Sequence, residues 1–317
     1  MSGPAKNHYV VENGAGNRSI WCLTRGAPPQ GWKVVGEARS KDACLDWIEA
    51  KAGKRGAAER PKRVTPLGPA GASAVIPFPH PAATERLFVF PHAGSGVTYY
   101  HFLAKALRPS CIEVVLVLYP GRELRMREDP IESMDELVAL LLAELGPCWD
   151  GRPFHFLGHS MGALAAFELT HRLRAEGMAE PRRLILSGRQ PPHLATNVLK
   201  MDGLSDAAFL DAVGHRYGAI PQAILENEDL RALILRGMRG DFVLMERYVV
   251  REREKLRQPL LLVNGREDRW IDPAHVAEWD QYTTGVVSCH FFAGDHFYLP
   301  QQTDALVQLI LDGPETT

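Results

Sequence analysis

Residues 154–167 read FHFLGHSMGALAAF, and in this stretch one hydroxyl stands between two glycines in an otherwise apolar run. The apolar residues 154–157 predict a buried strand, and the apolar positions from residue 161 onward predict a helix. Gly158 to Gly162 would then form a tight corner, in which the glycines relieve crowding around a serine in a strained backbone conformation. Such a corner presents Ser160 at the carboxyl edge of a sheet, beside a helix N-terminus that can receive an anion, so the stretch predicts a nucleophile.

The motif Gly-x-Ser-x-Gly is short, and a serine that merely caps the following helix is the alternative interpretation. A serine hydroxyl is a poor nucleophile at neutral pH. A histidine therefore has to accept its proton, and a carboxylate has to hold that histidine in one tautomer. In folds with this corner, the acid and the histidine follow the serine in the order Ser, Asp, His.

Three carboxylates follow the apolar run 260–263, in the segment NGREDRWID. Asp268 is our first choice for the orienting acid because it lies at the exit of a predicted strand. Asp272 and Glu267 are the alternatives, and three solvated loop charges are the interpretation without a catalytic role.

Three histidines compete for the part of the base. His275 lies at the start of a predicted helix and His290 within a predicted strand, whereas His296 lies in a glycine-containing loop just after the last strand. The fold requires its base in such a loop, so we predict that His296 is the base. A surface histidine is the alternative.

The reaction also needs two N–H groups aimed at the oxygen that becomes negative. The backbone N–H of Met161 is one candidate. The other is expected from the small-residue loop FPHAGSG at residues 90–96, where Ala93 is the preferred donor. His92, in the same loop, is interpreted as a brace for the loop.

Short apolar runs alternate with amphipathic stretches from residue 86 to about residue 312, a pattern typical of an α/β fold with a mostly parallel sheet. The predicted strands are 87–90, 114–117, 154–157, 184–186, 260–263 and 289–292. The predicted helices are 99–107, 134–145, 161–176, 273–279 and 303–311. Residues 201–256 show a helical pattern without a strand, which indicates a lid over one end of the sheet.

A stretch rich in Pro, Gly, Ala and basic residues, 52–81, predicts a linker between residues 1–51 and the larger domain, 82–317. The first domain reads as three short strands, 9–11, 19–22 and 32–36, followed by a helix, 41–50. It has no cluster of acid, base and nucleophile, so we expect a binding module. Trp21 and Trp32 are either its core or half-exposed rings that receive a partner's side chain.

Composition excludes several function classes. Lys and Arg total 36 against 38 Asp and Glu, so no global charge draws the chain to nucleic acid or to an anionic membrane. The 5 cysteines are scattered and form no Cys-x-x-Cys pair, which predicts reduced thiols and no zinc site. The N-terminus lacks a signal-peptide core, and no stretch approaches the roughly 18 apolar residues of a membrane span. We therefore expect a cytoplasmic protein without a metal or a cofactor.

The motifs VFPHAGSG, YPGRELR, GHSMGALAAFEL, LSGRQPPH, RGDFVLMERY, GREDRWI and GDHFYL, in this order, closely resemble the type II thioesterases of nonribosomal peptide and polyketide assembly lines. The resemblance implies an α/β-hydrolase that removes acyl groups from the phosphopantetheine arm of carrier proteins. It implies Ser160 as nucleophile, His296 as base and Asp268 as orienting acid. The phosphopantetheine would belong to the substrate and not to this chain.

Residues 7–50 resemble MbtH-like proteins, small partners of the adenylation domains of nonribosomal peptide synthetases. Ser19, Trp21 and Trp32 fall on the pattern of that family. The resemblance implies that these residues bind an adenylation domain, although Cys22 stands where the family has proline.

Two other functions are alternatives. One is a small-ester hydrolase, because a catalytic triad does not by itself indicate whether the leaving group is a thiol or an alcohol. The other is an accessory protein that binds an adenylation domain and carries an inactive hydrolase fold. The intact order of Ser160, Asp268 and His296 argues against the second.

Overall fold

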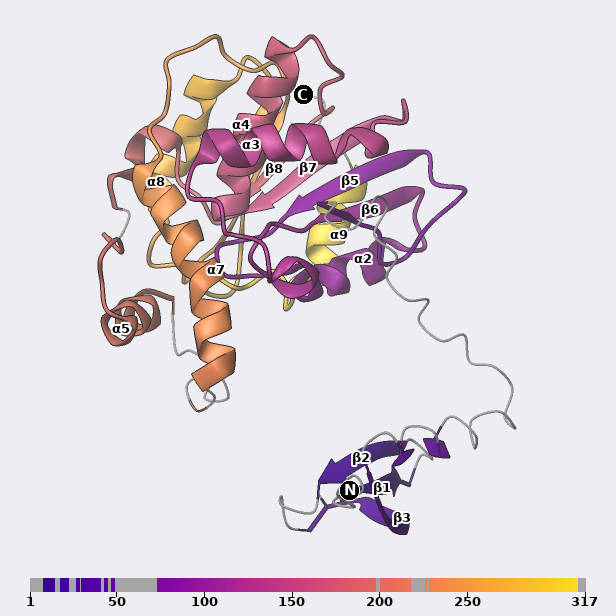
Figure 1. The fold of residues 1–317 in the computed structure, drawn as a ribbon. Helices are drawn as coiled ribbons and strands as arrows, with labels where there is room; N and C mark the ends of the chain where they lie inside the picture. The colour runs from indigo at the N-terminus through magenta and orange to yellow at the C-terminus, as the bar shows by residue number, and fades with distance from the viewer. Residues whose placement is uncertain are drawn as a thin grey trace. The chain divides into compact units, whose positions relative to one another are not determined.

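The computed structural model describes residues 8–14, 18–22, 27–28, 30–40, 43–44, 47–48, 73–197, 200–217, 226 and 228–312. The chain divides into two compact units, Met1–Arg63 and Val64–Thr317 (Figure 1). No helix in the described ranges combines the length and the hydrophobicity that a membrane crossing requires.

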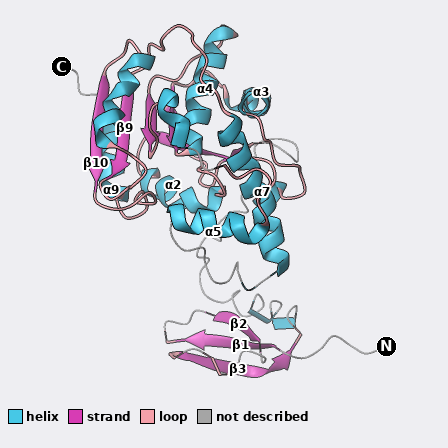
Figure 2. Ribbon diagram, turned by 90° about the vertical axis from the view of Figure 1, so that its left-hand side faces the viewer, coloured by secondary structure: helices cyan, strands magenta, loops and turns pink. Residues whose placement is uncertain are grey.

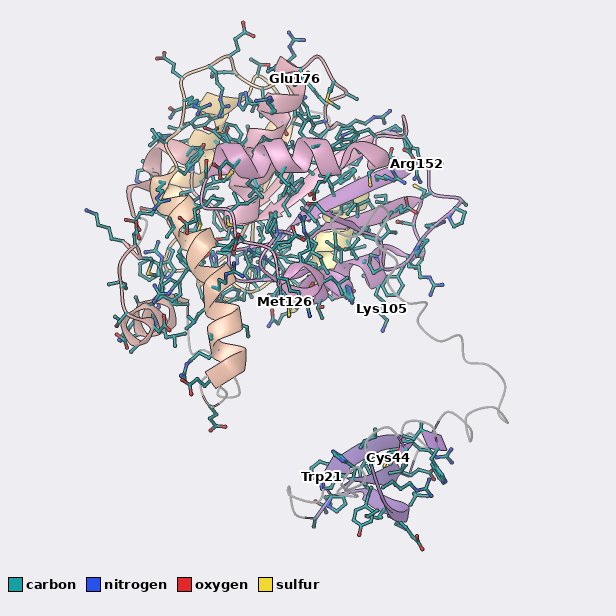
Figure 3. The ribbon with its side chains drawn as sticks, viewed as in Figure 1. Trp21, Cys44, Lys105, Met126, Arg152 and Glu176 are labelled. Carbon is teal, nitrogen blue, oxygen red and sulfur yellow. The ribbon has the colours of Figure 1, made fainter. Side chains whose placement is uncertain are left out.

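The first unit is a three-stranded antiparallel sheet in the order β2-β1-β3, formed by β1 (His8–Asn13), β2 (Arg18–Cys22) and β3 (Trp32–Arg39). The three predicted strands are therefore present, each slightly longer than predicted. Of the predicted helix 41–50, the described residues 43–44 and 47–48 are helical and the others lie outside the described residues. The side chain of Cys44 contacts the sheet through the carbonyl oxygen of His8 (Figure 3).

Strand pairing places both tryptophans on one face of this sheet. Trp21 pairs with Tyr9, and Trp32 pairs with Asn13. Tyr9 and Asn13 are four residues apart on β1, and side chains alternate along a strand, so these positions share a face. Trp47 belongs to the other face, because its ring lies under the guanidinium groups of Arg18 and Arg39, which pair with Glu12 and His8.

The second unit contains a seven-stranded sheet in the order β10-β9-β8-β7-β5-β6-β4. All the strand pairs are parallel except that of β4 with β6. The strands are β4 (Ala74–Val75), β5 (Glu85–Phe90), β6 (Ile112–Val117), β7 (Phe154–His159), β8 (Leu184–Ser187), β9 (Leu260–Gly265) and β10 (Val287–Phe292). The chain adds β6 on one side of β5 and then returns to add β7 on the other side. This reversal of strand order opens a crevice at the carboxyl ends of β5 and β7, the usual place for a ligand in such a sheet.

Helices cover both faces of the sheet (Figure 1). α3 (Met134–Glu144) and α4 (Met161–Ala175) pack on the face that carries Phe88 and Phe90, whereas α2 (His101–Leu107) and α9 (Thr303–Asp312) pack on the face that carries Leu87 and Val89. Every residue of β5 to β9 after the first position of β5 is buried, as expected for strands covered on both faces.

Two helices fill most of the predicted lid: α5 (Asp206–Tyr217) and α7 (Glu228–Arg247) (Figure 2). The helical prediction is wrong for residues 248–255, which follow α7 as a strap without regular secondary structure. Two arginines of this strap form ion pairs with acids of other elements: Arg251 pairs with Asp135 of α3, and Arg253 pairs with Glu168 of α4. The predicted helix 273–279 is also divided, into α8 (Pro273–Val276) and a 3₁₀ segment (Ala277–Tyr282).

The structure differs from the predicted linker at its carboxyl end. Ser73 to Ile76 lie within 52–81, yet they are buried and include β4, which pairs with β6. A strand of two small residues has no periodic pattern that a sequence could reveal. Residues 52–72 lie outside the described residues.

Candidate active site

Ser160 occupies a strained corner between β7 and α4. Its backbone has φ 54° and ψ −112°, a conformation that a residue with a side chain rarely adopts, and Ser160 N donates to the Ser187 carbonyl oxygen at 2.8 Å. Non-glycine strain of this kind is concentrated at functional sites. The corner therefore singles out Ser160 among the buried serines of the sheet.

The two flanking glycines are required by space. A Cβ at Gly158 would lie 2.2 Å from the carbonyl oxygen of Gly162, and a Cβ at Gly162 would lie 2.0 Å from the carbonyl oxygen of Phe90. The second approach brings the end of β5 against the start of α4, which explains why the loop after β5 lies beside Ser160. The glycines thus allow the predicted nucleophile and the predicted oxyanion loop to lie close together.

Asp268 and His296 form a buried pair. The Oδ2 atom of Asp268 lies 2.6 Å from Nδ1 of His296, and the exposed fraction is 5% for Asp268 and 6% for His296. The other carboxylate oxygen accepts a hydrogen bond from the backbone N–H of Trp270 at 3.1 Å. A buried carboxylate on Nδ1 leaves Nε2 as the nitrogen that can accept a proton.

The three candidate acids make different contacts in the structure. The backbone N–H of Glu267 donates to the Gly294 carbonyl oxygen at 3.1 Å, and the Glu267 carboxylate accepts from Gly294 N. Asp272 caps α8 by accepting from Ala274 N at 2.9 Å. Only Asp268 is paired with His296; Glu267 fastens the loop that carries His296.

The other two candidate bases lie elsewhere. His275 is exposed on α8, and its hydrogen bond to Glu278 raises its pKa. His290 lies in β10, within the strand. Neither lines the cavity at Ser160.

Two more histidines surround Ser160, and burial keeps both neutral. Burial, with the charges of His296 and Arg122, lowers the pKa of His92 to about 3, and Nδ1 of His92 lies 2.7 Å from the Tyr100 hydroxyl. Burial also lowers the pKa of His159 well below its usual value. Its ring lies 5.0 Å from that of His296, so a neutral His159 spares His296 the repulsion of a neighbouring cation.

A cavity of about 150 Å³ brings the predicted residues together, since Ser160, His296 and Ala93 all line it. Val213, Phe242 and Phe297 add an apolar wall, to which the lid contributes through α5 and α7. Met161 is fully buried at the first turn of α4. The two predicted N–H donors thus belong to the first turn of α4 and to the loop after β5.

An ion pair that sequence reasoning missed fastens the lid to the loop after β5. Asp241 of α7 accepts two hydrogen bonds from Arg122, at 2.6 and 2.7 Å, and one from Gly94 N at 2.7 Å. Arg122 and Asp241 stand in the quoted motifs YPGRELR and RGDFVLMERY, but 119 residues separate them. Only the folded chain reveals that the two motifs meet.

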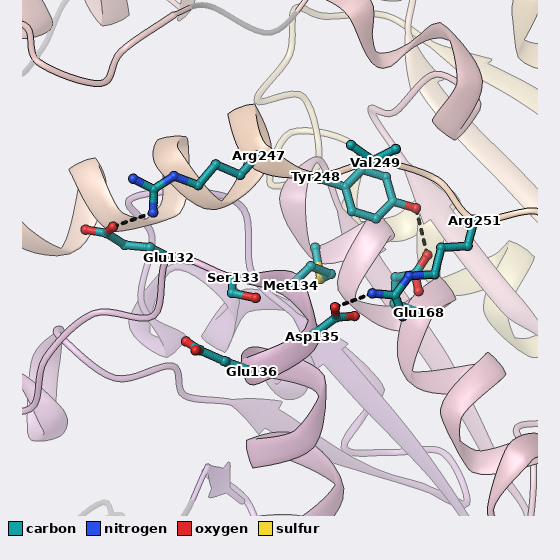
Figure 4. A pocket seen from close by; sticks show the side chains of 10 residues that line it. All are labelled: Glu132, Ser133, Met134, Asp135, Glu136, Glu168, Arg247, Tyr248, Val249 and Arg251. Carbon is teal, nitrogen blue, oxygen red and sulfur yellow. Dashed lines mark hydrogen bonds and ion pairs between the residues drawn. The ribbon is translucent and has the colours of Figure 1, made fainter.

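A larger cavity, of about 540 Å³, lies at the N-terminus of α3 and the end of α7 (Figure 4). Most of the charged side chains in it already have partners: Arg247 contacts Glu132, Arg251 contacts Asp135, and Glu168 accepts a hydrogen bond from the Tyr248 hydroxyl at 2.7 Å. It contains none of the predicted site residues. We therefore assign the reaction to the smaller cavity, where the reactive groups are.

Comparisons with known proteins give two family matches. The Thioesterase domain family matches residues 85–312, and the MbtH-like protein family matches residues 2–61. Thioesterase PikA5 of Streptomyces venezuelae is 34% identical over 234 residues, which are 74% of this chain and 82% of that protein.

Solved structures of similar proteins include two described as type II thioesterases. BorB from the borrelidin biosynthetic cluster is 33% identical, with a TM-score of 0.64 over 74% of this chain and 92% of that one. YbtT from the yersiniabactin NRPS/PKS biosynthetic pathway is 30% identical, with a TM-score of 0.67 over 76% of this chain and 97% of that one.

Proposed function

This chain belongs to the thioesterase family, and from that premise we propose that it hydrolyses acyl thioesters on the phosphopantetheine arm of carrier proteins in a nonribosomal peptide or hybrid polyketide assembly line. One observation carries the proposal for the mechanism: the strained Ser160 and the buried pair of His296 and Asp268 meet at one apolar cavity. We infer an editing role, in which misloaded or stalled acyl groups are removed.

In the proposed mechanism Ser160 Oγ attacks the thioester carbonyl carbon while His296 takes the hydroxyl proton. The N–H groups of Met161 and Ala93 stabilise the negative oxygen of the tetrahedral intermediate. The C–S bond then breaks and His296 returns the proton to the departing thiol, which leaves an acyl group on Ser160. Water, deprotonated by His296, then attacks the carbonyl carbon of this ester. The bond between that carbon and Ser160 Oγ breaks, His296 returns the proton to Oγ, and the products are the carboxylic acid and the free serine hydroxyl.

The test compares three substrates that carry the same acyl group: an acyl-carrier protein, an acyl-pantetheine and a simple ester. We expect the highest kcat/KM for the carrier protein and the lowest for the ester, because contacts outside the reacting centre contribute to transition-state binding. The Ser160→Ala variant, assayed on each substrate, measures the background hydrolysis that does not use the site, and this rate is subtracted.

Two outcomes would contradict the proposal. A preference for the simple ester that disappears in Ser160→Ala would identify a small-ester hydrolase. A folded protein that hydrolyses none of the three would leave an accessory protein with an inactive hydrolase fold.

For the first unit, we propose an adenylation domain as the partner, bound on the face that carries Trp21 and Trp32. Both rings are half-buried in the unit itself. Val34 is 44% exposed and pairs with Val11, which lies between Tyr9 and Asn13 on the same face of β1. Ser19 pairs with Val11 from the other side. Two half-buried aromatic rings and an exposed valine on one face form the kind of surface that receives a partner's side chain.

Trp32→Ala in the full chain should weaken binding to an adenylation domain by about tenfold or more, because aromatic anchors contribute most to such interfaces. Calorimetry of the two purified proteins measures the change. Lys33→Ala is the matched control, since Lys33 is the next residue on β3 and pairs with Glu12 on the opposite face. Equal losses for the two variants would place the interface elsewhere.

A further inference from the structure

Two cavities meet at one methionine of the lid. Beside the cavity at Ser160 lies a second cavity, of about 220 Å³, between α7 and the loop after β6. Met126 and Ile234 are among the residues that line it. Gly94 and Met238 line both cavities. The side chain of Met238 therefore forms part of the boundary between them.

The boundary is tight because Met238 lies against the backbone of Gly94. A Cβ built on Gly94 would lie 2.8 Å from Cε and 3.2 Å from Cγ of Met238. Gly94 also has φ +74°, so glycine serves two purposes at this position.

An anchor one helical turn away holds Met238 in place. Asp241 accepts the backbone N–H of Gly94 and is itself held by two hydrogen bonds from Arg122. Asp241 and Met238 are three residues apart on α7, so they lie on the same side of the helix. The helix cannot withdraw Met238 from Gly94 without breaking this buried ion pair, whereas the methionine side chain can rotate by itself.

The second cavity is suited to an apolar chain. Its carboxylate, Glu123, is occupied by the backbone N–H groups of Val97 and Thr98 at 3.0 and 3.1 Å. Its guanidinium, Arg122, is occupied by Asp241. What remains for a ligand is the surface of Met126, Ile234 and Met238.

We propose that Met238 sets the length of acyl chain that this site accepts. An apolar cavity of about 150 Å³ holds a molecule the size of benzene, so the cavity at Ser160 accommodates a short acyl group while Met238 is in place. A longer chain enters only when the Met238 side chain moves and joins the two cavities. This inference rests on the proposed thioester hydrolysis.

The test measures kcat/KM for acetyl-, butyryl-, hexanoyl- and octanoyl-pantetheine. The wild-type protein should prefer the short chains. Met238→Ala should raise the octanoyl-to-acetyl ratio by about tenfold or more, the size of effect that one or two methylenes have in an apolar pocket. Met238→Val should give an intermediate ratio, and Met238→Leu, which conserves the bulk, should keep the short preference.

Met245→Ala is the matched control. It removes the same side chain from the same helix, but Met245 is buried in the core and lines neither cavity. Its octanoyl-to-acetyl ratio should stay that of the wild type even if its stability falls. Titration of the active serine with a fluorophosphonate corrects all rates for the folded fraction.

Three results would overturn the proposal. They are a wild type that hydrolyses octanoyl and acetyl thioesters equally well, a Met238→Ala ratio equal to the wild-type ratio with unchanged rates, and the same ratio with an equal gain for every chain length. The last result would mean that the second cavity holds the pantetheine arm. A wild type that hydrolyses no thioester would overturn the proposed function instead. In that case calorimetric binding of acetyl- and octanoyl-pantetheine amides to wild type and Met238→Ala still decides the role of Met238.

Discussion

Ser160→Ala should lower kcat/KM for an acyl-pantetheine thioester by about 10⁴-fold or more, the loss typical of a serine hydrolase without its nucleophile. The fold should survive, because alanine also carries a Cβ and meets the same backbone restriction at φ 54° as serine does. Thioester hydrolysis followed by thiol release, together with thermal unfolding, measures both quantities. If the variant unfolds near the wild-type temperature but has lost its activity, the loss is due to the missing hydroxyl and not to unfolding.

His296→Ala provides the second half of this experiment. If serine and histidine act as one unit, the double variant Ser160→Ala/His296→Ala should be about as slow as either single variant. His275→Ala is the control, because that histidine is exposed on α8 and does not line the cavity. Multiplying losses, or an equal loss in His275→Ala, would contradict the proposed pair.

The residues of this site that could be predicted are those whose role is indicated by the short segment around each of them. The glycines around Ser160 signal a corner because the space that excludes a Cβ belongs to the next turn and to the adjoining strand. Asp268 and His296 could be chosen because each follows a predicted strand, and the two strands end at the same edge of the sheet. In all three cases, local pattern and position in the fold agree.

The parts that escaped prediction depend on residues far apart in the chain. Asp241 meets Gly94 across 147 residues, and no periodicity of either segment indicates the contact. The strand β4 has only two residues, too few to show a periodic pattern, and it is a strand because it pairs with β6. The strap after Arg247 resembles a helix in composition but is not helical, and its ion pairs are made with Asp135 and Glu168, far away in the chain. Tertiary contacts override local propensity in each case.

The first unit shows an intermediate case. Its three strands are predictable from alternation, but the shared face of Trp21 and Trp32 follows only from the register with β1. A shift of one residue in either pairing would move one ring to the opposite face. The proposed partner surface therefore depends on the register of both pairings.

Asp268→Asn should lower kcat by about 10⁴-fold while leaving the shape of the site unchanged. The amide can donate to Nδ1 of His296, where the carboxylate now accepts at 2.6 Å. That exchange moves the imidazole proton to Nε2, the nitrogen that has to accept the proton of Ser160, and it removes the negative charge that stabilises the imidazolium. Steady-state kinetics on one acyl-pantetheine should show the loss in kcat with little change in KM.

The two neighbouring acids, Asp272 and Glu267, serve as controls for Asp268 because all three carboxylates lie in the segment after β9. Asp272→Asn should keep its activity, because asparagine caps a helix about as well as aspartate and the Asp272 side chain contacts Ala274 N and the exposed His275, not His296. Glu267→Gln should lose about tenfold or less, since it weakens one hydrogen bond to the loop of His296 and changes no proton on the ring. If Asp272→Asn or Glu267→Gln lost as much as Asp268→Asn, the orienting acid would have to be reassigned. The 2.6 Å contact would then be a structural bond between two loops and not part of the reaction.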